Sequence, residues 1–164
     1  MSQFIRIEFL NPSHDRNSFN CGHSSLDNYL KTQANQDVKR KISKVFIATD
    51  KMDVKKVLGF YTLSTISIGL SQLPKDKSRK LPRHPIPAAL IGRLAVNQSA
   101  QGKGIGSMLL ADAVKRTLSI SNEIGIYALV VDAIDGAAAD FYTQYGFESL
   151  NTSNRLFLPL KSIL

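Results

Sequence analysis

The chain contains a single cysteine, Cys21, among its 164 residues. One cysteine cannot form an intramolecular disulfide or a cysteine metal cage. The three histidines, His14, His23 and His84, also lack the spacing of metal ligands. A buried thiol explains Cys21 better than an acyl-relay nucleophile does, although His23 stands two residues away. The sequence therefore predicts a protein without a bound metal.

Long hydrophobic runs are absent too, since no apolar stretch approaches the roughly 20 residues of a membrane span. The first residues, MSQFIRIEFL, carry Arg6 and Glu8 and no small-residue cleavage site, so no signal peptide is expected. No repeat or low-complexity segment is found. The hydrophobic share of 43% and the charged share of 21% fit one soluble globular domain over residues 1–164. We expect that domain in the cytoplasm and away from membranes.

Acidic residues are in the minority, with 13 Asp and Glu against 21 Lys and Arg, for a formal net charge of +8. The excess is clustered at residues 39–44 and 75–83. Such clusters form a solvated basic face in many proteins. They are equally typical of a large anionic partner, of which nucleic acid is the first candidate. Charge alone leaves both explanations open.

The first half of the chain predicts three strands and one helix. Alternating residues 4–10 indicate a strand, and β-rich runs at residues 44–50 and 57–68 indicate a hairpin. The segment SSLD at residues 24–27 resembles a capping box that opens a helix through about Ala34. The inner face of that helix is expected to carry Leu26, Tyr29 and Leu30.

The second half alternates strands and helices. Residues 69–87 are rich in Lys, Arg and Pro, and the prolines predict a loop without regular structure. A strand is expected over residues 89–97 and, after a glycine loop, a helix with apolar spacing through Leu118. The apolar run at residues 126–133 predicts a central strand. Asp135 is expected to cap a helix that ends before Gly146, and RLFLPL predicts a last strand. The fold class is α/β, with a central mixed sheet flanked by helices.

The loop QGKGIG contains three glycines, Gly102, Gly104 and Gly106, and leads into a helix. A P-loop and a dinucleotide fingerprint would both require glycine at position 107, where this chain has Ser107. The pattern Q/R-x-x-G-x-G/A is met, with Gln101 in first place. Backbone N–H groups from residues 102–107 can converge on an anion there, and the helix dipole adds to the attraction.

Taken together, GRLAV, QGKGIG, VVDA and DFYTQYGF resemble the GNAT N-acetyltransferases. In that family the loop holds the pyrophosphate of coenzyme A, so the resemblance implies acetyl-CoA as co-substrate. It implies that the strand before the loop pairs with the pantetheine arm and stabilises the oxyanion, and that the tyrosine of the FY pair, Tyr142, protonates the departing thiolate. Packing as an ordinary aromatic is the alternative for Tyr142. The cofactor contacts implied are Leu94, Ala95, Val96, Gln101, Gly102, Lys103, Gly104, Ile105, Gly106, Ser107, Ala133 and Asp135.

A narrower resemblance covers most of the chain from residue 19 to residue 147, through FNCGHSSLDNYL, GFYTLS, IPAALIGRLAVNQSAQGKGIGSMLL and VVDAIDGAAADFYTQYGF. These segments look like the GNAT toxins of bacterial toxin–antitoxin pairs. The resemblance implies acetylation of the α-amine of aminoacyl-tRNA, a block of translation, a ribbon-helix-helix antitoxin and a homodimer. Asn97 departs from the acidic residue of many relatives, and we expect it to affect the strand end rather than the chemistry.

The basic clusters are compatible with tRNA as a partner. An α-amine titrates near pH 8, so a neutral fraction exists without a strong base. Glu148 and Asp132 are more readily explained as structural residues than as bases. Acetylation of a protein N-terminus or a small amine stays open, although the net charge disfavours polyamines. A non-catalytic module that binds coenzyme A or nucleic acid is a further alternative. The expected tRNA contacts are Arg93, for which an ion pair is the alternative, and Lys39, Arg40, Lys41, Lys77, Arg79, Lys80 and Arg83.

Overall fold

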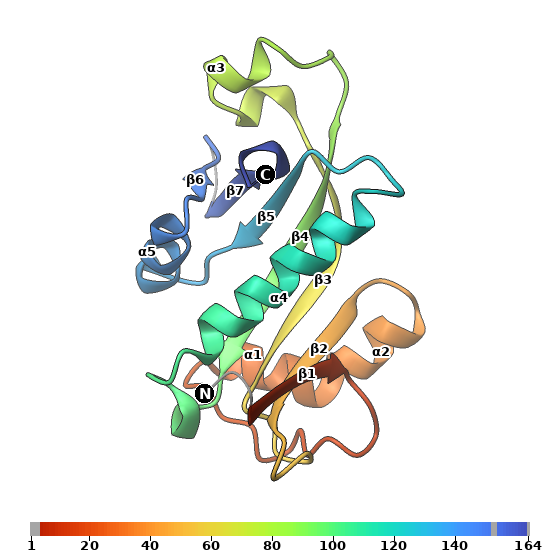
Figure 1. The fold of residues 1–164 in the computed structure, drawn as a ribbon, viewed down its shortest axis with the longest axis vertical. Coiled ribbons are helices and arrows are strands. Elements are labelled where there is room, and N and C mark those ends of the chain that lie inside the picture. The colour runs from red at the N-terminus through yellow and green to blue at the C-terminus, as the bar shows by residue number, and fades with distance from the viewer. Residues whose placement is uncertain (1–3, 152–153, 164) are drawn as a thin grey trace. The chain divides into compact units, whose positions relative to one another are not determined.

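The computed structural model describes residues 4–151 and 154–163 (Figure 1). The chain divides into two compact units. Unit 1 comprises Met1–Ser64 and Gly92–Lys115, and unit 2 comprises Thr65–Ile91 and Arg116–Leu164. No helix among the described residues is both long and apolar enough to cross a membrane.

The described strands form a mixed sheet in the order β1-β2-β3-β4-β5-β7-β6. Neighbours β1 and β2, β2 and β3, β5 and β7, and β6 and β7 are antiparallel, whereas β4 and β5 are parallel. The α/β class with a mixed sheet is therefore confirmed. The strand bounds are β1 Ile5–Phe9, β2 Lys44–Asp50, β3 Gly59–Ile68, β4 Ile86–Val96, β5 Ala128–Asp132, β6 Glu148–Ser149 and β7 Arg155–Pro159.

In unit 1 both faces of the sheet are covered by helices, which lie in front of and behind β2 and β3 in Figure 1. Helices α1 (Ser24–Asn28) and α2 (Ala34–Lys39) pack their buried side chains against one face, which carries Val45, Ile47 and Phe60. On the other face the Tyr61 hydroxyl donates to Asp112 Oδ2 of helix α4 (Ile105–Ile120) at 2.6 Å. Side chains of successive strand residues point to opposite faces of the sheet, so Phe60 packs with α1 and α2 whereas Tyr61 faces α4.

The first helical segment differs from its prediction in two respects. It runs through α1 (Ser24–Asn28), a π-helical turn η2 (Tyr29–Gln33) and α2 (Ala34–Lys39), five residues beyond Ala34. The predicted capping box is wrong, because His23 is the N-cap and makes no side-chain capping bond. Asp27 instead accepts a hydrogen bond from the Cys21 N–H at 2.9 Å. The inner face is confirmed, since all three of its predicted apolar residues, Leu26, Tyr29 and Leu30, are buried.

Unit 2 has its own core, built around β5 and β7 with Val130 and Phe157 fully buried. The predicted loop at residues 69–87 is partly wrong. It contains the short helices η3 (Leu70–Gln72) and α3 (Lys75–Ser78), and β4 begins at Ile86 and includes Pro87. A proline is tolerated near the start of a strand, and the Pro87 carbonyl still accepts the Tyr127 N–H at 2.9 Å.

Helix α5 (Gly136–Gln144) begins as predicted, with the Asp135 carboxylate accepting the Ala138 N–H at 2.8 Å. It ends at Tyr145, and Gly146 follows with φ +95°, a conformation that favours glycine at a helix C-terminus. The two-residue strand β6 was not predicted, since so short a segment carries no periodic signal. The remaining helical turns are η4 (Gln98–Ala100) and η5 (Leu160–Ser162).

Candidate active site

The glycine loop lies in unit 1, between the end of β4 and the start of α4. Gly102 and Gly104 have φ values of +79° and +81°, which L side chains rarely adopt. A Cβ atom at either position would meet nothing within 4 Å. Glycine is therefore required there by the backbone conformation and not by crowding within the chain. The open space over both residues fits a loop that receives a ligand against its backbone.

Gln101 ties this loop to the rest of unit 1. Its Nε2 donates to the carbonyl oxygens of Val96 at 3.0 Å and Cys21 at 3.1 Å. Because the side-chain amide donates to both carbonyls, it fixes the first residue of the loop to the end of β4 and to the segment that precedes α1. Helix geometry leaves the first N–H groups of α4, those of Ile105 and Gly106, without a carbonyl four residues back. These are the groups that the dipole of a 16-residue helix orients toward an anion.

Asn97 fixes the end of β4. Its Oδ1 accepts the Asn20 N–H at 2.9 Å, and its Nδ2 donates to Ser99 Oγ at 2.8 Å. The backbone N–H of Asn97 also donates to the Leu58 carbonyl at 2.7 Å. With 8% of its surface exposed, Asn97 is a structural tether at the strand end, in line with the expectation that it leaves the chemistry alone.

The strand before the loop continues past its pairing with β5. The ladder between β4 and β5 runs from Ala88 to Ile91 on β4 in the described chain, whereas β4 extends to Val96. Residues 92–96 are held on their other side by β3, where the Arg93 N–H donates to Thr62 Oγ1 at 3.1 Å. Leu94, Ala95 and Val96 thus belong to a strand segment outside the β4–β5 ladder, as backbone pairing with a ligand requires.

A pocket of about 390 Å³ adjoins the loop within unit 1. Lys103 and Ile105, both predicted cofactor contacts, line it together with Ser99 and Met108. Asp50, the last residue of β2, and Asp53 and Lys56 from the turn that follows also line it. The pocket therefore combines both signs of charge with apolar side chains.

In unit 2 the predicted proton donor, Tyr142, lies on α5 with 3% of its surface exposed. Its ring contacts Phe141 and Phe147, at centroid distances of 5.2 and 5.6 Å. Burial, assisted by the negative charge of Asp132, raises the pKa of Tyr142 above its usual value. No described residue forms a hydrogen bond with the Tyr142 hydroxyl. A hydroxyl that stays protonated and donates to no described residue is chemically suited to give its proton to a leaving group.

Two predicted cofactor contacts, Ala133 and Asp135, line a second pocket of about 260 Å³ at the start of α5 in unit 2. The Asp135 carboxylate is occupied by its capping bond to Ala138. The Asp132 Oδ1 accepts from Arg155 Nε at 2.7 Å. This ion pair supports the structural explanation of Asp132 over that of a general base.

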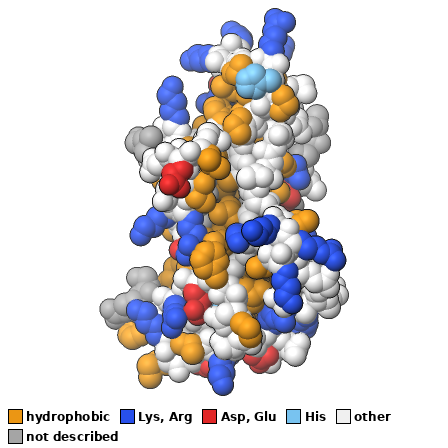
Figure 2. All heavy atoms as spheres, turned by 90° about the vertical axis from the view of Figure 1, so that its right-hand side faces the viewer, with side chains coloured by type: hydrophobic (Ala, Val, Ile, Leu, Met, Phe, Trp, Pro, Cys, Tyr) orange, Lys and Arg blue, Asp and Glu red, His pale blue; other side chains and the backbone are white. Residues whose placement is uncertain are grey.

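The predicted tRNA contacts fall into both units. Lys39, Arg40 and Lys41 lie at the end of α2 in unit 1, and all three are exposed. In unit 2 the exposed contacts are Arg79, Lys80 and Arg83, whereas Lys77 is half-buried and lies 4.0 Å from Asp76. On the face shown in Figure 2, blue Lys and Arg side chains project along most of the surface and red carboxylates are few.

Among the described residues, Arg93 makes an aromatic contact and no ion pair, which was the alternative for it. Its guanidinium carbon lies 3.6 Å from the centroid of the Tyr29 ring. Tyr29 itself donates its hydroxyl to Asp37 Oδ2 at 2.8 Å. Burial and this bond to Asp37 raise the pKa of Tyr29 to about 12, so the hydroxyl stays protonated near neutral pH. Neither Tyr29 nor Asp37 was singled out for a site role from the sequence, which holds no motif that pairs them.

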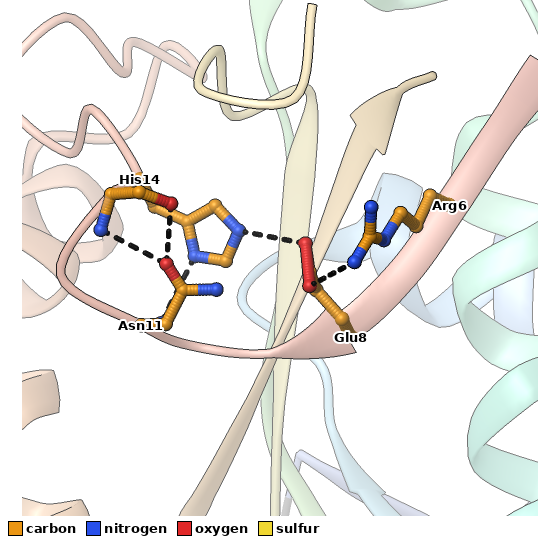
Figure 3. Close-up of polar contacts among 5 residues, drawn as sticks. Arg6, Glu8, Asn11 and His14 are labelled. Atoms are coloured by element: carbon orange, nitrogen blue, oxygen red, sulfur yellow. Dashed lines mark hydrogen bonds and ion pairs between the residues drawn. The ribbon is translucent and has the colours of Figure 1, made fainter.

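His14 is a structural residue (Figure 3). Its Nδ1 accepts the Asn11 N–H at 3.1 Å, so the ring proton is assigned to Nε2, which lies 3.3 Å from Glu8 Oε2. Glu8 also binds Arg6 at 3.1 Å.

Cys21 is buried, and burial raises the pKa of its thiol to about 11, which leaves little thiolate. The described residues contain no group of three His, Cys, Asp or Glu side chains placed to hold a metal ion.

Comparison with known proteins identifies the family. Residues 41–149 match the family described as acetyltransferase (GNAT) domain. The chain belongs to the GNAT acetyltransferases. The matched segment includes both the glycine loop and Tyr142. This acetyltransferase is 35% identical over 167 residues to a probable toxin TacT of Sinorhizobium fredii (strain NBRC 101917 / NGR234), covering 96% of this chain and 92% of the relative. It is 34% identical over 148 residues to a tRNA-acetylating toxin of Mycobacterium tuberculosis (strain ATCC 25618 / H37Rv), covering 90% and 87%.

Solved structures give the same result for this GNAT enzyme. It superposes with a TM-score of 0.90 on AtaT complexed with acetyl-methionyl-tRNAfMet, at 35% identity over 97% of this chain and 96% of the other. A mutant AtaT toxin bound to the C-terminus of the antitoxin AtaR and to acetyl-CoA gives a TM-score of 0.82, at 32% identity over 97% and 95%. The enzyme is thus an acetyltransferase of a fold that has been observed with acetyl-CoA.

Proposed function

We propose that this chain is the toxin of a toxin–antitoxin pair and transfers an acetyl group from acetyl-CoA to the α-amine of aminoacyl-tRNA, which blocks translation. The observation that carries the proposal is the likeness, over almost the whole chain, to a tRNA-acetylating toxin and to AtaT in complex with acetyl-methionyl-tRNA. The glycine loop, the stretch of β4 beyond its ladder with β5, and the Tyr142 hydroxyl, which bonds to no described residue, supply the groups that acetyl transfer needs.

Acetyl-CoA, when bound, supplies an acetyl group activated as a thioester. The loop N–H groups of residues 102–107 hold its pyrophosphate, because two glycines keep that backbone open. The strand stretch Leu94, Ala95 and Val96 pairs its backbone with the pantetheine arm, and one backbone N–H of this stretch donates to the carbonyl oxygen as it gains negative charge under attack by the amine. Lys103, Gln101, Ala133 and Asp135 complete the proposed cofactor contacts.

Tyr142 acts as general acid in this mechanism. When the carbon–sulfur bond breaks, the departing sulfur takes the proton of the Tyr142 hydroxyl. Because burial raises the pKa of this tyrosine, the proton is present throughout the neutral pH range. The attacking α-amine titrates near pH 8, and its neutral fraction reacts without a strong base on the enzyme. After the attack the nitrogen loses one proton to water, and Tyr142 regains a proton from water, so that the products are the amide and the free thiol.

The proposed acceptor is bound by basic side chains. Exposed Lys39, Arg40 and Lys41 form the contacts of unit 1 together with Arg93, and Lys77, Arg79, Lys80 and Arg83 form those of unit 2. We further propose one catalytic domain over residues 1–164, a ribbon-helix-helix antitoxin, a homodimer and a location in the cytoplasm, where charged tRNA is found. A solved toxin relative bound to the C-terminus of its antitoxin supports the antitoxin as a partner.

The test uses radiolabelled acetyl-CoA with total aminoacyl-tRNA. Label should enter the aminoacyl-tRNA fraction and should be released as an N-acetylated amino acid when the ester bond to the tRNA is hydrolysed. Tyr142→Phe should lower kcat by about 10²–10⁴-fold without loss of acetyl-CoA binding. Tyr145→Phe, at the exposed tyrosine that directly follows the same helix, is the matched control and should retain activity. Label only in protein N-termini or in polyamines would overturn the proposed acceptor, and acetyl-CoA binding without any transfer would indicate a non-catalytic module.

A further inference from the structure

Arg93 is held against an aromatic column inside unit 1. Its guanidinium carbon lies 3.6 Å from the Tyr29 ring centroid. Tyr29 in turn stacks on Phe60, with centroids 6.3 Å apart and ring planes 10° from parallel. Phe60 meets Phe19 edge to face at 5.5 Å. Because Tyr29, Phe60 and Phe19 are all buried, the platform under the guanidinium is rigid.

The π-helical turn η2 sets the position of Tyr29. Tyr29 and Asp37 are eight residues apart, and in a regular α-helix such residues are rotated by about 80° from each other. The extra residue that a π turn accommodates reduces this offset to about 20°, which brings both side chains to one face. The Tyr29 hydroxyl then donates to Asp37 Oδ2 at 2.8 Å, and Gln33 Nε2 donates to Asp37 Oδ1 at 3.1 Å.

The guanidinium keeps its hydrogen-bonding capacity. Arginine carries five N–H donors and no acceptor, and no described residue accepts a hydrogen bond from the Arg93 side chain or forms an ion pair with it. Arg93 is half-buried, so part of its surface remains in contact with solvent. Stacking fixes the plane of the fork and lowers the entropy lost when it grips a ligand.

We propose that Arg93 and Tyr29 form a preorganised oxyanion site that takes a phosphodiester group of the bound tRNA, with Tyr29 as the positioning residue. This inference rests on the proposed function, which supplies the RNA. Exposed cations along the same helical segment, Lys39, Arg40 and Lys41, favour a polyphosphate backbone as the source of the oxyanion. A carboxylate on a protein partner would be a different ligand, and the test separates the two.

The experiment measures binding of deacylated bulk tRNA to the full chain over a range of salt concentrations. Arg93→Gln should weaken binding about 5–30-fold and lower the slope of log K against log salt by about one. Arg93→Lys keeps the charge but not the planar fork, so it should keep the slope and lose affinity. Lys161→Gln, which removes one charge from an exposed lysine of unit 2, is the matched control and should bind as the wild type does.

The role of Tyr29 is tested by a double-mutant cycle. Tyr29→Leu removes the ring and should weaken binding about 3–10-fold, whereas Tyr29→Phe keeps the ring and should bind within about twofold of the wild type. Tyr29→Leu combined with Arg93→Gln should bind no more weakly than Arg93→Gln alone, because Tyr29 acts through Arg93. Circular dichroism and thermal unfolding check the fold. Tyr29→Met, which also removes the ring but fills more of its volume, replaces Tyr29→Leu if that variant does not fold.

Three results would overturn the inference. They are equal binding by Arg93→Gln and Lys161→Gln, additive losses in the double variant, and a defect confined to binding of the antitoxin. If the wild-type chain neither binds tRNA nor acetylates aminoacyl-tRNA, the proposed function fails instead, and this outcome is distinct because it appears before any variant is compared.

Discussion

Gln101 donates its side-chain amide to the carbonyl of Cys21, eighty residues earlier in the chain, at 3.1 Å. A second bond from the same nitrogen reaches the Val96 carbonyl at 3.0 Å. The glycine loop is thereby anchored at its first residue to the strand before it and to the segment that precedes α1. A loop that must meet a pyrophosphate with its backbone is more effective when it is ordered beforehand.

Replacing Gln101 by Ala should therefore weaken binding of acetyl-CoA about 5–10-fold, since both anchoring bonds are lost. The effect on folding should be small, about 0.5–1.5 kcal/mol, because Gln101 is exposed. Calorimetric titration with acetyl-CoA and urea unfolding measure the two quantities. An affinity equal to that of the wild type would show that the loop is ordered without this side chain.

The left-handed loop residues give a second prediction with an internal control. Gly104→Ala places a side chain at φ +81° and should cost about 1 kcal/mol of folding free energy, together with a loss of acetyl-CoA affinity. Gly125→Ala also enters open space, but its φ is not in the left-handed region, so neither quantity should change appreciably. Equal stability of the two variants in chemical unfolding would contradict the conformational role of Gly104.

Lys41 is the one non-glycine residue with positive φ in the described chain, at +61°. It follows the last turn of α2, where glycine is the usual residue. Lys41→Gly should raise the unfolding free energy by about 0.5–1 kcal/mol and yet weaken tRNA binding, because it relieves the strain and removes a cation. Lys41→Gln should weaken binding to the same extent without the gain in stability. If Lys41→Gly gained stability but bound tRNA as tightly as the wild type, the lysine would have no role in the tRNA contact.

Burial of Tyr142 makes the protein sensitive to alkaline pH. Its pKa is raised above the value of about 10 that an unfolded chain shows, so below pH 10 both states are protonated and this contribution to stability is fully present. Above pH 10 the unfolded state ionises first. The unfolding free energy should then fall by up to about 1.4 kcal/mol per pH unit from this residue.

Tyr142→Phe removes that contribution, so its unfolding free energy should decline less steeply between pH 10 and 11 than that of the wild type. Urea denaturation at pH 9, 10 and 11 measures the difference. Tyr145→Phe, whose ring is exposed, should follow the wild type. Parallel curves for all three proteins would show that the Tyr142 hydroxyl ionises equally well in the folded and unfolded states.

Local patterns predicted most elements because their signals are contained in a few residues. The strand at residues 44–50 and the capping of α5 by Asp135 match the structure. The segment at residues 69–87 was harder. Its prolines predict no regular structure, yet it contains two short helices. Asn151, from a distant segment, stabilises the first of them by donating hydrogen bonds to the Ser71 and Leu73 carbonyls. A contact between residues about eighty positions apart leaves no periodic trace in the sequence.

The same distinction applies to the candidate site. The glycine spacing and Ser107 were enough to exclude a P-loop and a dinucleotide site, because backbone conformation at a glycine is a local property. Coenzyme A was implied by the resemblance of the loop and its flanking segments to the GNAT family. The partner of Arg93 was not predictable. Whether an arginine meets a carboxylate or an aromatic ring depends on which helix packs over its strand.

By itself, the sequence determined the α/β class, the glycine loop with its helix, the position of Tyr142 on α5 and the basic clusters, since each depends on residues close together in the chain. Only the tertiary structure decided that Gln101 and Asn97 tie the end of β4 to the residues before α1. It also decided that Asp27 accepts a hydrogen bond from Cys21 and does not cap its own helix. Finally, it placed Tyr29, through the π turn, beneath the Arg93 guanidinium. Those contacts join segments that meet through packing of the core, and packing is a property of the whole chain.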